Sequence, residues 1–138
     1  PTLATIWRIT KALESPLEDI LSVKEGTTCF EKLSQNATPE VMSEDSGFRL
    51  KILGTLNTVS TVQWYEFTAE PKAELVSEAH GIGSLESLTL CTGELTVIVG
   101  DETQYICKGD TLRFRTDVAH RLKNEGKEKA HGFMVNLL

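Results

Sequence analysis

Three side chains in the second half of the sequence have the chemical types that hold a divalent metal ion: His80, Glu86 and His120. Two imidazoles and one carboxylate suit Zn²⁺, Fe²⁺, Mn²⁺ or Ni²⁺. Three protein ligands leave coordination positions open for water or a small molecule. We therefore predict a divalent metal here, zinc first, with iron, manganese or nickel as alternatives. The competing interpretation is a metal-free pocket, in which these groups hydrogen-bond buried neighbours.

The elements that would position these residues are short β-strands. From residue 46 onward, apolar residues recur with a period of two, and Gly-rich turn signals separate the segments. The segments are Phe48 to Ile52, Val62 to Phe67, Leu75 to Val76, Leu85 to Cys91, Leu95 to Val99, Gln104 to Cys107, Thr111 to Phe114, Arg121 to Asn124 and Gly132 to Leu138. No long helical pattern interrupts them, which disfavours a parallel sheet with crossover helices. The sequence predicts a mainly β fold, an antiparallel barrel or sandwich.

Alternation along the strands decides which side chains share a face. We expect three such sets: His80 with Ile82 on one strand face, Glu86 with Leu88 and Leu90, and His120 with Leu122 and Asn124. Closing the strands into one barrel would bring the two histidines and the glutamate to a single interior point. An unpaired carboxylate there would be costly to ionise, and a metal or a cationic ligand group would offset that cost.

Further residues are candidates for binding a ligand in the same interior. Leu88 and Asn124 have the inward parity, and Trp64 lies at the pocket mouth or simply packs. Arg113 and Arg115 have the parity opposite to their apolar neighbours. We predict that one or both reach the pocket and clamp a carboxylate ligand, with a solvated outer face as the alternative. No residue is predicted to be catalytic.

The first 21 residues differ from the rest of the chain in the spacing of their apolar residues. Residues 1–21 show apolar residues at helical spacing, and Ser15 followed by Pro16 and Glu18 is a helix-start signal. We predict two short helices there, a polar linker over residues 22–45, and a barrel over residues 46–138. Two short helices cannot bury their apolar faces alone.

The chain is acidic, with a formal net charge of -6 and a pI of about 5.1. Such a chain repels phosphate, so we expect poor nucleic-acid binding by the chain itself. The sequence has no apolar run long enough to predict a membrane span, and no signal segment opens it. We therefore expect the protein in the cytoplasm. Cys29, Cys91 and Cys107 are widely spaced, so we expect buried free thiols in a reducing compartment, with a redox-sensing pair as the alternative. We interpret His131 as a surface or structural residue.

With these residues in place, the sequence resembles the cupin superfamily over about residues 46–138. The first motif of that family reads G-x5-H-x-H-x3-E-x6-G; here it gives His80, Glu86 and Gly93, with Ile82 in place of the second histidine. The second motif, G-x5-P-x-G-x2-H-x3-N, gives Gly109, Arg115, Asp117, His120 and Asn124 at the same spacing, with Arg115 replacing the proline and Asp117 the glycine. The resemblance implies a cupin barrel in which His80, Glu86 and His120 match metal-ligand positions.

The first 21 residues resemble the fourth and fifth helices of an Xre-type helix-turn-helix domain. This resemblance implies that DNA-reading helices precede Pro1 and that the chain is a portion of a longer homodimeric regulator. The barrel would then sense a small-molecule effector, such as an amino acid or related acid, and would not be an enzyme. Two alternatives remain open: a metal-dependent cupin dioxygenase or isomerase, and a barrel that serves only structure or dimerisation.

Overall fold

The structure is a computed structural model that describes residues 30, 32–44, 46–55 and 58–138. The chain divides into two compact units, Pro1–Lys32 and Leu33–Leu138, and all elements below belong to the second. They are the 3₁₀ turn η1 (Gln35–Ala37) and the strands β1 (Glu40–Met42), β2 (Phe48–Ile52), β3 (Val62–Ala69), β4 (Glu74–Ser77), β5 (Leu85–Thr92), β6 (Glu94–Val99), β7 (Glu102–Cys107), β8 (Thr111–Arg115), β9 (His120–Lys123) and β10 (Ala130–Leu137). The two predicted helices and Cys29 lie outside the described residues.

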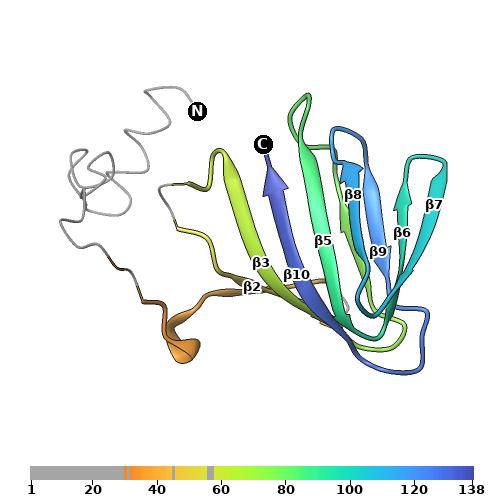
Figure 1. Cartoon of the computed structure of the whole chain (residues 1–138), viewed down its shortest axis with the longest axis horizontal. Coiled ribbons are helices and arrows are strands. Elements are labelled where there is room, and N and C mark those ends of the chain that lie inside the picture. Colours follow the sequence, from red (N-terminus) through yellow and green to blue (C-terminus); the bar gives the residue numbers. More distant parts are fainter. Residues whose placement is uncertain (1–29, 31, 45, 56–57) are drawn as a thin grey trace. The chain divides into compact units, whose positions relative to one another are not determined.

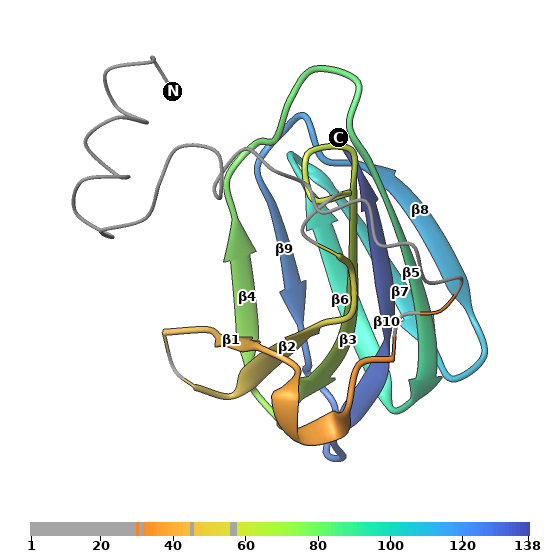
Figure 2. The ribbon, with the colours of Figure 1, turned by 90° about the vertical axis from the view of Figure 1, so that its left-hand side faces the viewer.

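Two antiparallel sheets face each other in the second unit (Figures 1 and 2). One sheet has six strands in the order β1-β2-β3-β10-β5-β8, and the other has four in the order β4-β9-β6-β7. After β3 the chain crosses repeatedly from one sheet to the other, for example between β5 and β6 and between β8 and β9, so strands distant in sequence become neighbours. This topology places β8 and β7 at the edges of their respective sheets.

The core lies between the sheets and follows from the alternation of apolar residues. In β5, burial alternates residue by residue, and the inward positions are Glu86, Leu88 and Leu90. The same alternation in β9 buries His120 and Leu122. The buried apolar cluster comprises Phe48, Phe67, Ala69, Ala73, Leu88, Leu90, Leu95, Val97, Ile106, Leu122, Ala130 and Met134. The mainly β fold predicted from the sequence is therefore confirmed.

Gly132 allows the central strand β10 to approach its neighbours closely. It is paired with Phe67 in β3 and with Leu90 in β5, beside a register shift in the β10–β5 pairing. A Cβ atom at this position would overlap the backbone oxygen of Thr89 and would lie 2.8 Å from the Phe67 ring. The absence of a side chain is therefore what lets the Phe67 ring occupy the core beneath β10.

The strands agree with the predicted segments, and two local differences have physical reasons. All nine predicted segments are strands, and β1 adds a tenth within the stretch that we expected to be linker. The expectation that His80 and Ile82 share a strand face is wrong, because both lie in the loop between β4 and β5. Gly83 in that loop has a φ of 85°, which belongs to a turn. Ile82 is fully exposed as a result.

Two of the other sequence expectations can be compared with the structure. His131 is half-buried in a structural pair, since its Nε2 lies 2.9 Å from Oε1 of Glu66 on the neighbouring strand. The expectation of buried thiols is wrong for Cys107, which is exposed at the end of β7 with its thiol donating to Asp110. Cys91 is half-buried. No helix in the described part of the chain is long and apolar enough to cross a membrane.

The close approach at Gly132 gives a stability prediction. Gly132→Ala should lower the free energy of unfolding by about 3 kcal/mol, because the added methyl group forces β5 and the Phe67 ring apart. Gly81→Ala is the matched control, since a Cβ at Gly81 meets nothing within 4 Å. Urea denaturation of both variants measures the effect. Equal stability of the two variants would show that β10 tolerates a side chain at this position.

Candidate functional site

Polar side chains gather at one end of the space between the sheets. In the six-stranded sheet, cross-strand pairing aligns Gln63 with Asn136, Asn136 with Glu86, and Glu86 with Phe114. Directly paired residues of antiparallel strands project from the same face of a sheet. These four residues therefore form one row across β3, β10, β5 and β8, and its two central members are buried.

A second row crosses the four-stranded sheet at the same end. His120 is paired with Ser77 on one side and with Val99 on the other, and Val99 is paired with Glu102. The rings of His120 and Phe114 meet edge to face, with centroids 5.7 Å apart. This contact shows that the two rows face each other across the barrel interior. We call the two rows together the polar end of the barrel.

His120 is joined by His80, which reaches it from the β4–β5 loop. The two imidazole centroids are 5.3 Å apart, with the rings edge to face. The backbone N–H of His80 donates to the carbonyl of Thr116 at 2.7 Å, and this bond fixes the loop. His120 Nδ1 lies 3.1 Å from the carbonyl oxygen of Val118. A carbonyl only accepts hydrogen bonds, so Nδ1 carries the proton and Nε2 is left as an acceptor in the neutral ring. Burial, together with the nearby His80, lowers the pKa of His120.

Glu86 is the buried acid of the polar end. Its side chain is 5% exposed, and its Oε1 has no hydrogen-bond partner among the described residues. Burial raises its pKa from the ordinary value of 4.5 to about 7, because the interior disfavours the charged carboxylate. Tyr65 lies near enough for the charge of Glu86 to add to the effect of burial in raising the pKa of the phenol. A group of this kind is typical of a functional site.

A buried polar cluster that sequence reasoning missed holds the loops of this end together. Thr116 Oγ1 lies 2.9 Å from Ser84 Oγ and 3.4 Å from Asn136 Oδ1. The Thr116 N–H also donates to the carbonyl of Ser84 at 3.1 Å. Asn136 had a signal in the sequence, since it is a polar residue at the buried parity of β10. Ser84 and Thr116 lie outside strands, where alternation gives no signal.

The predicted metal ligands are partly brought together. The two histidine rings are adjacent, and Glu86 offers an unpartnered oxygen. However, no group of three His, Cys, Asp or Glu side chains within residues 30, 32–44, 46–55 and 58–138 is placed to hold a metal ion. The motif position of the second histidine holds Ile82, which points into solvent. The donor types suit a metal, but the arrangement is incomplete, and the metal set stays a prediction.

The predicted ligand-binding residues lie in different places. Leu88 is fully buried in the apolar core. Asn124 is also buried, and its side chain is occupied: Nδ2 donates to the carbonyls of Ala69 and Glu128, each at 2.8 Å, and Oδ1 accepts from Gly126. Asn124 therefore ties the end of β3 to the loop between β9 and β10.

The other three candidates are exposed. Trp64 lies on the outer face of β3. Arg113 projects outward from β8, and Arg115 Nη2 lies 2.6 Å from Asp117 Oδ2. This placement agrees with the alternative stated for the two arginines, a solvated face. Their parity, opposite to that of Leu112 and Phe114, was the signal for it.

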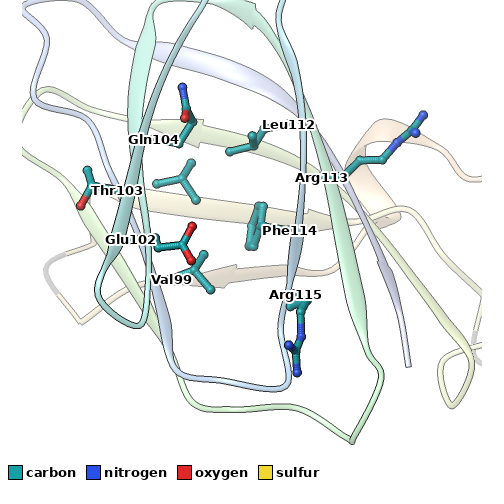
Figure 3. A pocket seen from close by; sticks show the side chains of 9 residues that line it. Val99, Glu102, Thr103, Gln104, Leu112, Arg113, Phe114 and Arg115 are labelled. Atoms are coloured by element: carbon teal, nitrogen blue, oxygen red, sulfur yellow. The ribbon is translucent and has the colours of Figure 1, made fainter.

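A cavity of about 370 Å³ lies between the edge strands β7 and β8, next to the polar end (Figure 3). We call it the seam cavity. The residues around it are Val97, Val99, Glu102, Thr103, Gln104, Leu112, Arg113, Phe114 and Arg115. Its volume is within the range of small-molecule pockets. The sequence did not predict it, because a gap between two sheet edges depends on tertiary packing.

The fold and this arrangement of residues agree with a known family. The model of the cupin domain family matches residues 65–136, which include Glu86, His120 and most of the wall of the seam cavity. The chain belongs to the cupin domain family.

The particular proteins that this chain is similar to include transcription regulators. The HTH-type transcriptional regulator SutR of Escherichia coli (strain K12) is 28% identical over 134 residues, which cover 95% of this chain and 68% of SutR. The crystal structure of a cupin domain of an XRE family transcriptional regulator from Enterobacter cloacae has a TM-score of 0.61 at 20% identity, covering 67% of this chain and 97% of that one. The crystal structure of FeII HppE has a TM-score of 0.68 at 15% identity, covering 99% and 76%. The two structures support the fold.

The raised pKa of Glu86 predicts a dependence of stability on pH. The folded protein holds this proton up to about pH 7, whereas the unfolded chain releases it near pH 4.5. The free energy of unfolding should therefore fall as the pH rises between these values and stay level above them. The loss is about 3 kcal/mol at most. Glu86→Gln should remove this slope, as measured by urea denaturation between pH 5 and pH 8.

His120 serves as an internal reference in the same experiment. Its pKa is lowered, so its contribution to stability is lost as the pH falls below the unfolded value of 6.5. This loss occurs in both proteins, and the difference between them isolates Glu86. The same slope in the parent and in Glu86→Gln would mean that the carboxyl is ionised without cost.

Proposed function

We propose that this cupin domain is the ligand-sensing part of a bacterial DNA-binding transcription regulator. The observation that carries the proposal is the seam cavity beside the polar end, in a chain that is 28% identical to a transcriptional regulator over nearly its whole length. In this proposal a small molecule enters between β7 and β8. The regulator acts in the cytoplasm as a homodimer and contacts DNA through helix-turn-helix segments outside the barrel.

The path from the cavity to the rest of the domain supports a sensing role. Phe114 forms part of the cavity wall and touches His120, which belongs to the opposite sheet. Thr116, directly beyond β8, is joined to Ser84 in the β4–β5 loop. A ligand that separates β7 from β8 would therefore act on both sheets and on the loops of the polar end. It would change DNA binding only if its affinity differs between the two arrangements of the regulator.

A metal-dependent cupin enzyme, a dioxygenase or isomerase, is the second candidate function. The adjacent rings of His80 and His120 and the unpartnered oxygen of Glu86 favour it, as does the fold shared with FeII HppE. The incomplete grouping of metal-ligand types in the described part of the chain weighs against it. A divalent ion bound by His80, Glu86 and His120 would add a second occupant to the barrel without excluding a sensing role.

The sensing proposal is tested by filling the cavity. A thermal-shift screen with amino acids, organic acids, amines and sugars should find compounds that raise the melting temperature, since a ligand that binds only the folded state stabilises it. Gln104→Trp should lower the affinity of such compounds at least tenfold, because Gln104 has the inward parity of buried Ile106. Arg49→Trp, on the exposed surface of β2, is the control of equal bulk. If both variants bind every hit as the parent does, the seam cavity is not the sensing site.

The metal prediction is tested by elemental analysis. After dialysis against Zn²⁺, Mn²⁺ or Ni²⁺, or against Fe²⁺ without oxygen, the protein should retain one equivalent of metal if His80, Glu86 and His120 gather around an ion. His120→Ala should then lose most of that metal, because two remaining donors bind weakly, whereas His131→Ala should keep it. Equal metal content in His120→Ala and the parent would remove His120 from the site. Oxygen consumption by the metal-loaded protein would favour the enzyme.

A further inference from the structure

The two walls of the seam cavity differ in chemistry. Val97 and Val99 of β6 and Leu112 and Phe114 of β8 form an apolar surface, whereas β7 contributes polar groups. Figure 3 shows the carboxylate of Glu102 projecting from β7 toward Phe114. A molecule in this space would thus have an apolar body beside one negatively charged group.

Among the described residues, no positive side chain is paired with that carboxylate. In the part of the chain that the structure describes, the side chain of Glu102 has no hydrogen bond and no ion pair. The two arginines beside the cavity are directed elsewhere. Arg113 points away from the space in Figure 3, and Arg115 is held by Asp117 through two hydrogen bonds of 3.0 and 2.6 Å. The carboxylate of Glu102 is therefore the charged group that faces the seam cavity.

One group deeper in the polar end also favours a donor. Phe114 separates the cavity from His120, whose Nε2 is an acceptor because Nδ1 donates to the carbonyl of Val118. The buried carboxyl of Glu86, paired with Phe114 across β5 and β8, keeps its proton up to about pH 7 and sets no such preference. An N–H group of a ligand would therefore meet an acceptor at His120 as well as at Glu102.

We propose that the sensed molecule carries a protonated primary amine on a short apolar chain, with the ammonium group at Glu102 and the chain against Val99 and Phe114. This inference rests on the proposed sensing function and names its ligand class. It differs from the acid that Arg113 and Arg115 suggested in the sequence. An exposed ion pair contributes little by itself. The apolar contact is therefore required as well as the charge, which explains why the class is an alkyl amine and not ammonium alone.

Three probes of equal length separate charge from apolar contact: n-pentylammonium, 1-pentanol and pentanoate. Isothermal titration calorimetry would use the whole chain, freed of metal with EDTA. We expect n-pentylammonium to bind at least tenfold more tightly than pentanoate, with 1-pentanol between them. Because an exposed carboxylate is screened by salt, raising the NaCl concentration should reduce the preference for the amine.

Variants then assign the preference to a residue. Glu102→Gln should bring the affinity for n-pentylammonium down to that for 1-pentanol while leaving the affinity for 1-pentanol unchanged. Glu128→Gln, an exposed acid outside the seam cavity, is the charge-matched control and should keep the full preference. Circular dichroism of each variant checks that it is folded.

Two results would overturn the amine proposal. One is that pentanoate binds as tightly as n-pentylammonium. The other is that Glu102→Gln leaves the affinity for n-pentylammonium unchanged. A different result would contradict the sensing function. That function requires Gln104→Trp to lower the affinity of the compounds found in the wider screen. If those compounds are acids whose binding Gln104→Trp abolishes, the cavity is a sensing site with another ligand class.

Discussion

The burial of apolar side chains between the two sheets offsets the free energy that the polar end of the barrel costs. Phe67 and Leu90 from one sheet meet Leu95 and Leu122 from the other in a core that excludes water. A buried carboxyl group without a partner, such as that of Glu86, costs free energy, and the burial of this apolar surface offsets the cost. Natural domains commonly place such locally unfavourable groups where they bind something.

The fold was largely predictable from the sequence because period-two alternation is strong in the long strands. In β5 and β10, each buried residue is followed by one that is less buried, which is the pattern a half-buried strand requires. β1 was missed because its three residues are all exposed and carry no such pattern. His80 was placed on a strand because parity was carried from His80 through Gly81 to Ile82, where the backbone forms a loop.

The site was predictable where strands position its residues and unpredictable where tertiary packing does. Glu86 and His120 were expected inside, and both are buried. The contact between Thr116 and Ser84 could not be predicted, because it joins two loops. Glu102 was missed for another reason: β7 is exposed along most of its length, and only the opposing edge of β8 makes one of its faces a cavity wall.

The position of the seam cavity between β7 and β8, each the last strand of its sheet, has a consequence for solubility. Edge strands present unpaired backbone groups to which a foreign strand can add. Charged side chains along such edges oppose that addition, and Glu102, Arg113 and Arg115 occupy these edges. If these charges were neutralised so that the pocket takes a more apolar compound, the exposed edges would favour fibrous self-association. The entrance cannot be made more apolar without removing what keeps neighbouring molecules apart.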